Sequence, residues 1–193
     1  MVVQRLRVSS QRALEMGLLI VFVVVLGYFA WLGYEAIPRR PRVPFGAGVV
    51  FDGEQAYQHV VAQLRFGPRR DTGSEGWRRT GAFISQTLRQ YRWQVEIQEF
   101  IYQGTRVRNI IGRAGRGPVA IIGAHYDTRR RADNDPNPDN RGQPVPGAND
   151  GASGVAVLLE LARSLDPNLL RHEVWLVFFD AEDNGRIDGW DWV

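Results

Sequence analysis

The sequence predicts an α/β domain built on a mostly parallel or mixed central sheet. Helical segments with one apolar face alternate with strand-like runs after residue 50, and the last run, HEVWLVFFD, is almost continuously apolar. Such a strand is typical of a sheet that helices cover on both faces. The length of 193 residues and the hydrophobic share of 44% are ordinary for a chain with one globular core. We therefore expect one domain, over residues 50–193.

The N-terminal part predicts a membrane anchor. Residues 16–34 carry no charge and follow a basic tail over residues 1–15. This apolar stretch is at the short end of what spans a bilayer, and the aromatic residues near its end suit a membrane interface. A cleaved signal peptide is the alternative, but it would favour small residues there. Short N-terminal tails usually stay inside, so we expect the domain to lie outside the cytoplasm, after a Pro/Arg linker over residues 35–49.

The elements of the domain follow from local signals. Asp52 and Ser74 are in position to cap helices within FDGEQAYQHVVAQLRFG and EGWRRTGAFISQTLRQY. The strand-like runs WQVEIQEFIY, TRVRNIIGR and PVAIIGAHYDT come next. A long polar loop then leads to the helical segment DGASGVAVLLELARSL and to the last apolar strand. This alternation predicts the sheet and its helical cover.

The composition restricts the possible functions. All 24 basic residues are arginine, and they come as scattered pairs and triplets among 21 acidic residues. A nucleic-acid interface would need them gathered on one element, so we expect no nucleic-acid partner. The chain has no cysteine, which excludes disulfides and thiolate metal sites. Any metal must therefore be held by histidine and carboxylates.

Acidic and imidazole groups gather where strands end. His125 and Asp127 end one strand, Asp150 stands at the start of a helix, and Glu182 and Asp183 follow the last strand. Ligands of open α/β sheets bind beyond the carboxyl ends of the strands. Each residue also has a structural interpretation: a helix cap for Asp150, a core histidine for His125, and a solvated turn for Glu182 and Asp183.

Convergence of these groups favours a metal site over those interpretations. Neighbouring carboxylates without a cation repel one another, and one of them would be forced to take a proton. A divalent metal removes that cost, and histidine with carboxylates suits zinc, or manganese or cobalt. Of the adjacent pair, one carboxylate can bind the metal while its neighbour accepts a proton from a metal-activated water.

The motifs GAHYDT, PVPGANDGASGVAVLLELAR and VWLVFFDAED resemble the zinc aminopeptidase family that also contains the glutaminyl cyclases. The resemblance covers about residues 50–193 and implies a three-layer sandwich with one or two zinc ions. It also implies roles: metal ligands His125, Asp150 and Asp183, with Asp127 orienting His125 and Glu182 as general base. Many relatives have two glutamates where this chain has Glu182 and Asp183.

The branch within the family stays open at this point. Aminopeptidase action on peptide or protein N-termini is our first hypothesis, in which a metal-activated water attacks the carbonyl with Glu182 as base. Phe66–Arg69 (FGPR) and Gly73–Ser74 resemble the entry region of the glutaminyl cyclases, which would form N-terminal pyroglutamate. Trp190 and Trp192 either line a substrate pocket or pack in the core. A ligand-binding ectodomain without activity is a further alternative.

The sequence ends soon after the acidic pair Glu182 and Asp183. The resemblance implies another acidic ligand and a C-terminal histidine ligand downstream of Asp183, and a sheet of this class normally continues. We therefore expect the sequence to be incomplete at its C-terminus and inactive as it stands.

Overall fold

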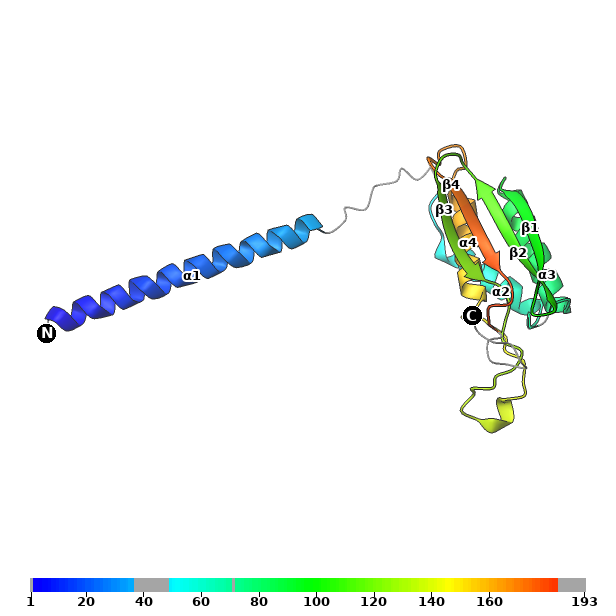
Figure 1. Cartoon of the computed structure of the whole chain (residues 1–193), viewed down its shortest axis with the longest axis horizontal. Helices are drawn as coiled ribbons and strands as arrows, with labels where there is room; N and C mark the ends of the chain where they lie inside the picture. Colours follow the sequence, from blue (N-terminus) through cyan, green and yellow to red (C-terminus); the bar gives the residue numbers. More distant parts are fainter. Residues whose placement is uncertain (1, 37–48, 71, 184–193) are drawn as a thin grey trace. The chain divides into compact units, whose positions relative to one another are not determined.

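The chain divides into two compact units, Met1–Val43 and Pro44–Val193. The structure is a computed structural model and describes residues 2–36, 49–70 and 72–183. In the first unit, helix α1 spans Val2–Ala36 (Figure 1). Its part Glu15–Gly33, with a mean hydropathy of 2.4, is long and apolar enough to cross a membrane by length and composition. The apolar helix predicted over residues 16–34 is confirmed as a helix.

The second unit opens with two capped helices. Helix α2 spans Gly53–Arg65, and the side chain of Asp52 accepts hydrogen bonds from the amides that follow it. Helix α3 spans Glu75–Gln90, and Ser74 Oγ accepts a hydrogen bond of 3.3 Å from the amide of Trp77. Both predicted caps are confirmed, because each satisfies amides that have no partner inside the helix.

A sheet of four strands follows, in the order β1-β2-β4-β3 (Figure 1). The strands are β1 Gln94–Tyr102, β2 Thr105–Ala114, β3 Val119–His125 and β4 Glu173–Phe179. Strand β2 pairs antiparallel with β1 and with β4, whereas β3 and β4 run parallel. The sheet is mixed, as predicted.

The antiparallel share of the described sheet is larger than the alternation of helices and strands predicted. Gln103 and Gly104 both have positive φ, 47° and 78°, in the turn between β1 and β2. Two such residues form the tight turn that matches the twist of a hairpin. Of the strands that the structure describes, only β3 and β4 are therefore joined by a helical crossover, through helix α4 (Ala152–Ser164).

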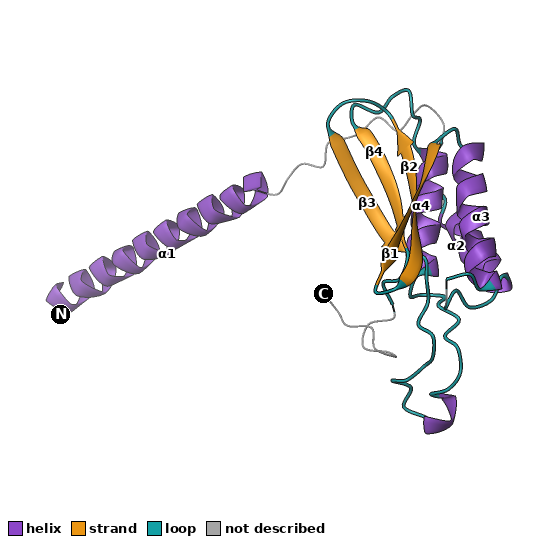
Figure 2. Cartoon of the chain, turned by 45° about the vertical axis from the view of Figure 1, so that its right-hand side comes forward, coloured by secondary structure: helices purple, strands orange, loops and turns teal. Residues whose placement is uncertain are grey.

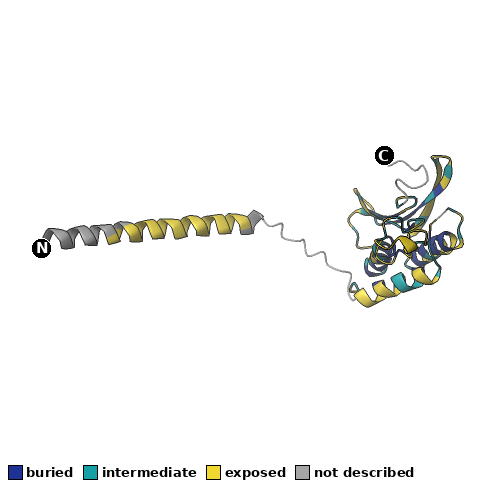
Figure 3. Cartoon of the chain, turned by 90° about the horizontal axis from the view of Figure 1, so that it is seen from below, coloured by how far each residue is buried: buried dark blue, intermediate teal, exposed yellow. Residues whose placement is uncertain are grey.

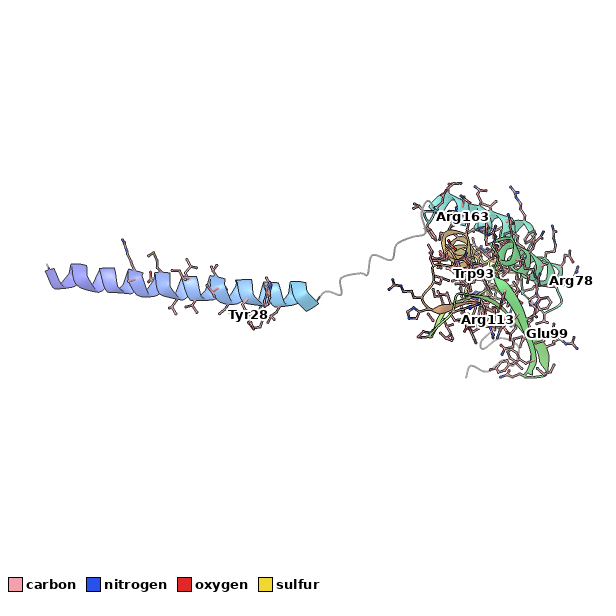
Figure 4. The ribbon with its side chains drawn as sticks, turned by 90° about the horizontal axis from the view of Figure 1, so that it is seen from above. Tyr28, Arg78, Trp93, Glu99, Arg113 and Arg163 are labelled. Carbon is pink, nitrogen blue, oxygen red and sulfur yellow. The ribbon has the colours of Figure 1, made fainter. Side chains whose placement is uncertain are left out.

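Helices α3 and α4 cover one face of the sheet, and α2 packs against α4 (Figure 2). Buried residues line the side of the helices that faces the sheet (Figure 3). Trp93 lies between the two layers (Figure 4) and donates a hydrogen bond of 2.9 Å from Nε1 to the carbonyl oxygen of Ala162. A second helical layer, expected for a three-layer sandwich, is not among residues 49–70 and 72–183; there Ile121 on the other face is 61% exposed.

The parallel pair β3 and β4 defines the end of the domain where the predicted site residues lie. Because their carboxyl ends lie at the same edge of the sheet, the segments after His125 and after Phe179 start side by side. The long loop between β3 and α4 extends from this end (Figure 1). It contains the short 3-10 helix Pro138–Asn140 and returns to the sheet at the start of α4.

Candidate active site

His125 is the centre of the group of polar residues at this end of the sheet. It is the last residue of β3, and its side chain is 17% exposed. Nε2 lies 2.9 Å from Oδ1 of Asp150, and Nδ1 lies 3.4 Å from Oδ1 of Asp127 and 3.6 Å from Oε2 of Glu182. Three acidic side chains from different segments thus surround one imidazole.

Asp150 does not cap helix α4. The residue at the cap position is Gly151, which has no side chain to accept a hydrogen bond from the helix. The side chain of Asp150 is 68% exposed and contacts His125 instead. Of the two interpretations of Asp150, the structure therefore favours a role in the polar group over a helix cap.

Asp127 connects His125 to Asp183. Its side chain is 2% exposed, and Oδ2 accepts a hydrogen bond of 3.0 Å from the amide of Asp183. Asp183 Oδ2 in turn accepts a hydrogen bond of 2.8 Å from the amide of Arg129. The side chain of Arg129 also donates to the carbonyl oxygen of Asp183 and to the carboxylate of Asp133. The backbone of the loop after β3 thus fixes the carboxylate of Asp183.

Glu182 occupies the open side of the site. Its side chain is 50% exposed, and Oε2 lies 3.6 Å from His125 Nδ1. Ala181, directly before it, has a positive φ of 62°. A non-glycine residue in this conformation is uncommon, and it turns the chain sharply at the end of β4. This turn directs Glu182 and Asp183 to different surroundings.

Asp180, directly after β4, connects this strand end to α3 and β2. Its Oδ2 accepts hydrogen bonds of 2.9 Å from Trp77 Nε1 and from the amide of Arg108. The guanidinium of Arg108 stacks 3.7 Å above the ring centre of Trp77. Burial raises the pKa of Asp180 to about 6, although these hydrogen bonds oppose the rise and the charge of Asp127 adds to it.

The electrostatics of the site favour positive charge. Burial alone would lower the pKa of His125, but the hydrogen bond with Asp127 and the charges of Asp127 and Glu182 outweigh it and raise the pKa to about 9. Burial also raises the pKa of Asp183 to about 6, and the charges of Asp150 and Asp127 add to that rise. Carboxylates that lack a compensating cation behave in this way.

The donor set fits a divalent metal by its chemistry. One imidazole and several carboxylates are ligands that zinc accepts, and two of the donor atoms, His125 Nε2 and Asp150 Oδ1, already face each other at 2.9 Å. Among the residues that the structure describes, no group of three or more such side chains is arranged to hold a metal ion. Asp183 faces the amide of Arg129 rather than His125.

Two predicted residues are not described, and two contributors to the site were not predicted. Trp190 and Trp192 lie outside the described residues. Sequence reasoning missed the contribution of Arg129, whose position in an arginine triplet gave no distinguishing signal. It also missed Arg69, for which the motif FGPR was the available signal.

Comparison with known proteins identifies relatives of this domain. Residues 109–192 match the model of peptidase family M28. An uncharacterized protein of Escherichia coli, YfbL, is 30% identical over 170 residues, which are 86% of this chain and 49% of that protein.

Several solved structures are similar to this chain in both fold and sequence. A glutaminyl cyclase from Porphyromonas gingivalis is 36% identical with a TM-score of 0.65, over 71% of this chain and 50% of that chain. A leucine aminopeptidase precursor from Bacteroides thetaiotaomicron is 35% identical with a TM-score of 0.66, over 74% and 51%. A Zn-dependent exopeptidase from Parabacteroides distasonis is 35% identical with a TM-score of 0.66, over 72% and 50%.

The chain therefore spans about half the length of these relatives. The fold of the chain, with its mixed sheet, is similar to theirs, and the family match over residues 109–192 includes every described residue of the polar group around His125. The chain thus resembles, over the N-terminal portion of their fold, the family of zinc aminopeptidases that also contains the glutaminyl cyclases.

Proposed function

We propose that this chain carries part of the active site of a zinc-dependent metallopeptidase of the aminopeptidase type, which acts on the N-termini of peptides. The observation that carries the proposal is the meeting of His125 and Asp150 at 2.9 Å, with Glu182 beside them. These residues come from a strand end, a helix entry and a second strand end. The fold brings them together at the edge where α/β sheets bind ligands.

Each residue has a distinct task in this proposal. His125, Asp150 and Asp183 would hold the metal, as one zinc ion or part of a two-zinc site. Asp127, nearly fully buried, keeps the imidazole of His125 oriented through its contact with Nδ1. Glu182, half exposed and next to His125, accepts and returns the proton during the reaction. Zinc, when bound, supplies Lewis-acid polarisation of the substrate carbonyl.

Glutaminyl cyclisation is the second candidate, in which the same Glu182 would move a proton of an N-terminal glutamine. It is favoured by the position of the FGPR segment: the guanidinium of Arg69 lies within hydrogen-bond distance of the carbonyl oxygens of Tyr126 and Gly147, beside His125 and Asp150. Incubation with a leucine chromogenic amide and with a Gln-Phe peptide separates the two. Release of free amino acid supports the peptidase, and pyroglutamate without such release rejects it.

The proposed location is a membrane surface outside the cytoplasm, with α1 as the anchor. A ligand-binding ectodomain without activity is the remaining alternative to an enzyme. Metal analysis of the purified full-length chain tests this alternative. Stoichiometric zinc that is lost in Asp150→Asn supports the enzyme site, whereas far less than one zinc per chain favours the ectodomain.

A further inference from the structure

Arg69 is the largest fully buried polar side chain in the described part of the molecule, with 0% exposure. Its guanidinium donates hydrogen bonds to three backbone carbonyl oxygens: 2.7 Å to Tyr126, 2.8 Å to Gly147 and 3.3 Å to Pro146. Burial lowers the pKa of Arg69 to about 10, so the group remains charged at neutral pH. A buried cation is costly unless its hydrogen bonds are satisfied, and here backbone oxygens satisfy them.

These acceptors belong to the two segments that meet in the candidate site. Tyr126 lies between His125 and Asp127, directly after β3. Pro146 and Gly147 begin the short segment that ends with Asp150 and the start of α4. One planar guanidinium therefore joins the backbone beside His125 to the backbone that carries Asp150. Arginine is suited to this because its donors have a fixed geometry.

The backbone of Arg69 strengthens the same connection. Its amide donates a hydrogen bond of 2.9 Å to Thr128 Oγ1, and its carbonyl oxygen accepts one of 3.3 Å from the amide of Thr128. The segment before Arg69 is itself closely packed: a Cβ atom on Gly76 of α3 would lie 2.3 Å from the carbonyl oxygen of Pro68. Arg69 is thus anchored to α3 on one side and to the segment after β3 on the other.

The segment that carries Asp150 has no free space toward Arg69. Gly147 has a φ of +66°, and a Cβ atom there would lie 2.7 Å from Arg69 Nη2 and 2.2 Å from Thr128 Cγ2. Gly151 has a φ of +92°, and a Cβ atom there would lie 2.8 Å from the carbonyl oxygen of Asp127. The close approach of backbone to guanidinium therefore depends on glycine at both ends of the segment.

We propose that Arg69 is a positioning residue of the active site, which sets the separation between the segment of His125 and the segment of Asp150. It touches neither substrate nor metal, and it acts through the carbonyl groups of Tyr126 and Gly147. Its charge also lies near the carboxylates of Asp127 and Asp183. The consequence for metal affinity rests on the proposed function, because it takes His125 and Asp150 as ligands.

The test compares Arg69→Met and Arg69→Lys with Arg163→Met in the full-length chain. Arg163 is the control because it is an arginine at the other end of α4, with a side chain that is 19% exposed, and it contacts Glu160 and Val50 instead of the site. Two quantities are measured: zinc affinity by competition with a chelator, and hydrogen–deuterium exchange of the Thr128 and Ala152 amides in the metal-free chain. Both amides donate to backbone oxygens that Arg69 holds or supplies.

In Arg69→Met we expect zinc affinity to fall about 10- to 100-fold, as for other residues that orient metal ligands. Exchange of the two amides should become faster. Arg69→Lys keeps the charge but lacks the planar guanidinium with its several donors. Its zinc affinity and its amide exchange rates should lie between those of Arg69→Met and those of the unchanged chain. Arg163→Met should keep the zinc affinity and the exchange rates of the unchanged chain.

Unchanged exchange and unchanged zinc affinity in Arg69→Met would overturn the proposal, and so would an equal loss of affinity in Arg163→Met. If the unchanged chain binds no zinc, the proposed function fails, while the exchange rates still decide whether Arg69 positions the two segments. If Arg69→Met does not fold, amide exchange is measured in Arg69→Lys and Thr128→Val instead. Unaltered exchange in both of these would reject the positioning role.

Discussion

The two ends of helix α4 hold buried charge in opposite ways. Near its C-terminal end, Glu160 is fully buried and receives hydrogen bonds from Arg163 and from the amide of Asp52, at 2.7 Å each. At its N-terminal end, the side chains that contact His125 in the described residues are all acidic. The buried cation there, Arg69, is bound by carbonyl groups instead of carboxylates.

This difference separates a stabilising ion pair from the candidate active site. The charges of Glu160 and Arg163 at the C-terminal end cancel each other. Arg163 also donates a hydrogen bond to the carbonyl oxygen of Val50, which attaches the start of the domain to α4. The group at the N-terminal end keeps an excess of negative charge next to solvent, which costs stability unless a cation arrives. Proteins accept such local cost where they bind or react. The predictions below test this contrast.

Replacement of Asp150 should have the largest effect at the N-terminal end of α4. Asp150→Asn removes the carboxylate that faces His125 Nε2, and we expect zinc affinity to fall at least about 100-fold. Because the side chain is 68% exposed, the melting temperature of the metal-free chain should hardly change. The control is Asp166→Asn near the other end of α4. Equal zinc affinity in both variants would show that Asp150 is not a metal ligand.

A side chain at position 147 should lower both stability and zinc affinity, because it displaces the backbone that carries Asp150. In Gly147→Ala the new Cβ atom meets Thr128 and Arg69 in a conformation with φ of +66°. We expect a loss of about 3 kcal/mol in the free energy of unfolding and weaker zinc binding. Gly142→Ala on the same loop is the control, because no atom lies within 4 Å of its added Cβ. A small effect at Gly147 would mean that the segment shifts without difficulty.

Removal of Arg163 should destabilise the opposite end without affecting metal binding. Arg163→Met leaves the buried carboxylate of Glu160 with the amide of Asp52 as its remaining partner, and we expect a loss of about 2 kcal/mol in urea unfolding. Arg78 pairs with Glu75 on the exposed face of α3 (Figure 4), and Arg78→Met should cost less than about 0.5 kcal/mol. Similar losses in both variants would show that burial of the Glu160 pair adds nothing.

The sequence allowed prediction of features that depend on neighbouring residues or on strand ends. The caps at Asp52 and Ser74 depend on amides two and three residues away, so local patterns suffice. His125 and Asp127 were predicted from their place at a strand end. Asp150, at the start of the helix between the two strands, was predicted to join His125 because ligands of open α/β sheets bind beyond the carboxyl ends of the strands.

Features that depend on distant contacts could not be predicted. The acceptors of Arg69 lie 57 and 78 positions away, and Trp77 and Asp180 are 103 positions apart. Apart from the motif FGPR, no local pattern distinguishes Arg69 from the exposed arginines around it. The hairpin at Gln103–Gly104 was not predicted either, because the alternation of helices and strands along the rest of the domain is typical of parallel strands.

The smallest predicted effect is a pH dependence of opposite sign at the two ends. Burial opposes ionisation of Glu160, but the hydrogen bonds from Arg163 and Asp52 outweigh it, so its pKa lies below the ordinary 4.5. A lowered pKa stabilises the fold above about pH 4.5, and this contribution disappears as the pH falls further. Glu160→Gln should therefore flatten the acid side of the stability curve in urea unfolding.

Asp180 should act in the other direction, because burial raises its pKa from 3.8 to about 6. The folded chain then binds the proton more tightly than the unfolded chain, so the contribution of Asp180 is present below about pH 3.8 and is lost as the pH rises to about 6. Asp180→Asn retains an oxygen for Trp77 and Arg108 but cannot ionise. In metal-free urea unfolding, this variant should lack the decline over that interval, while Glu160→Gln should retain it. A decline that persists in Asp180→Asn would assign the proton to another carboxylate of the site, with Asp183 as the first to test, since its pKa is also raised to about 6.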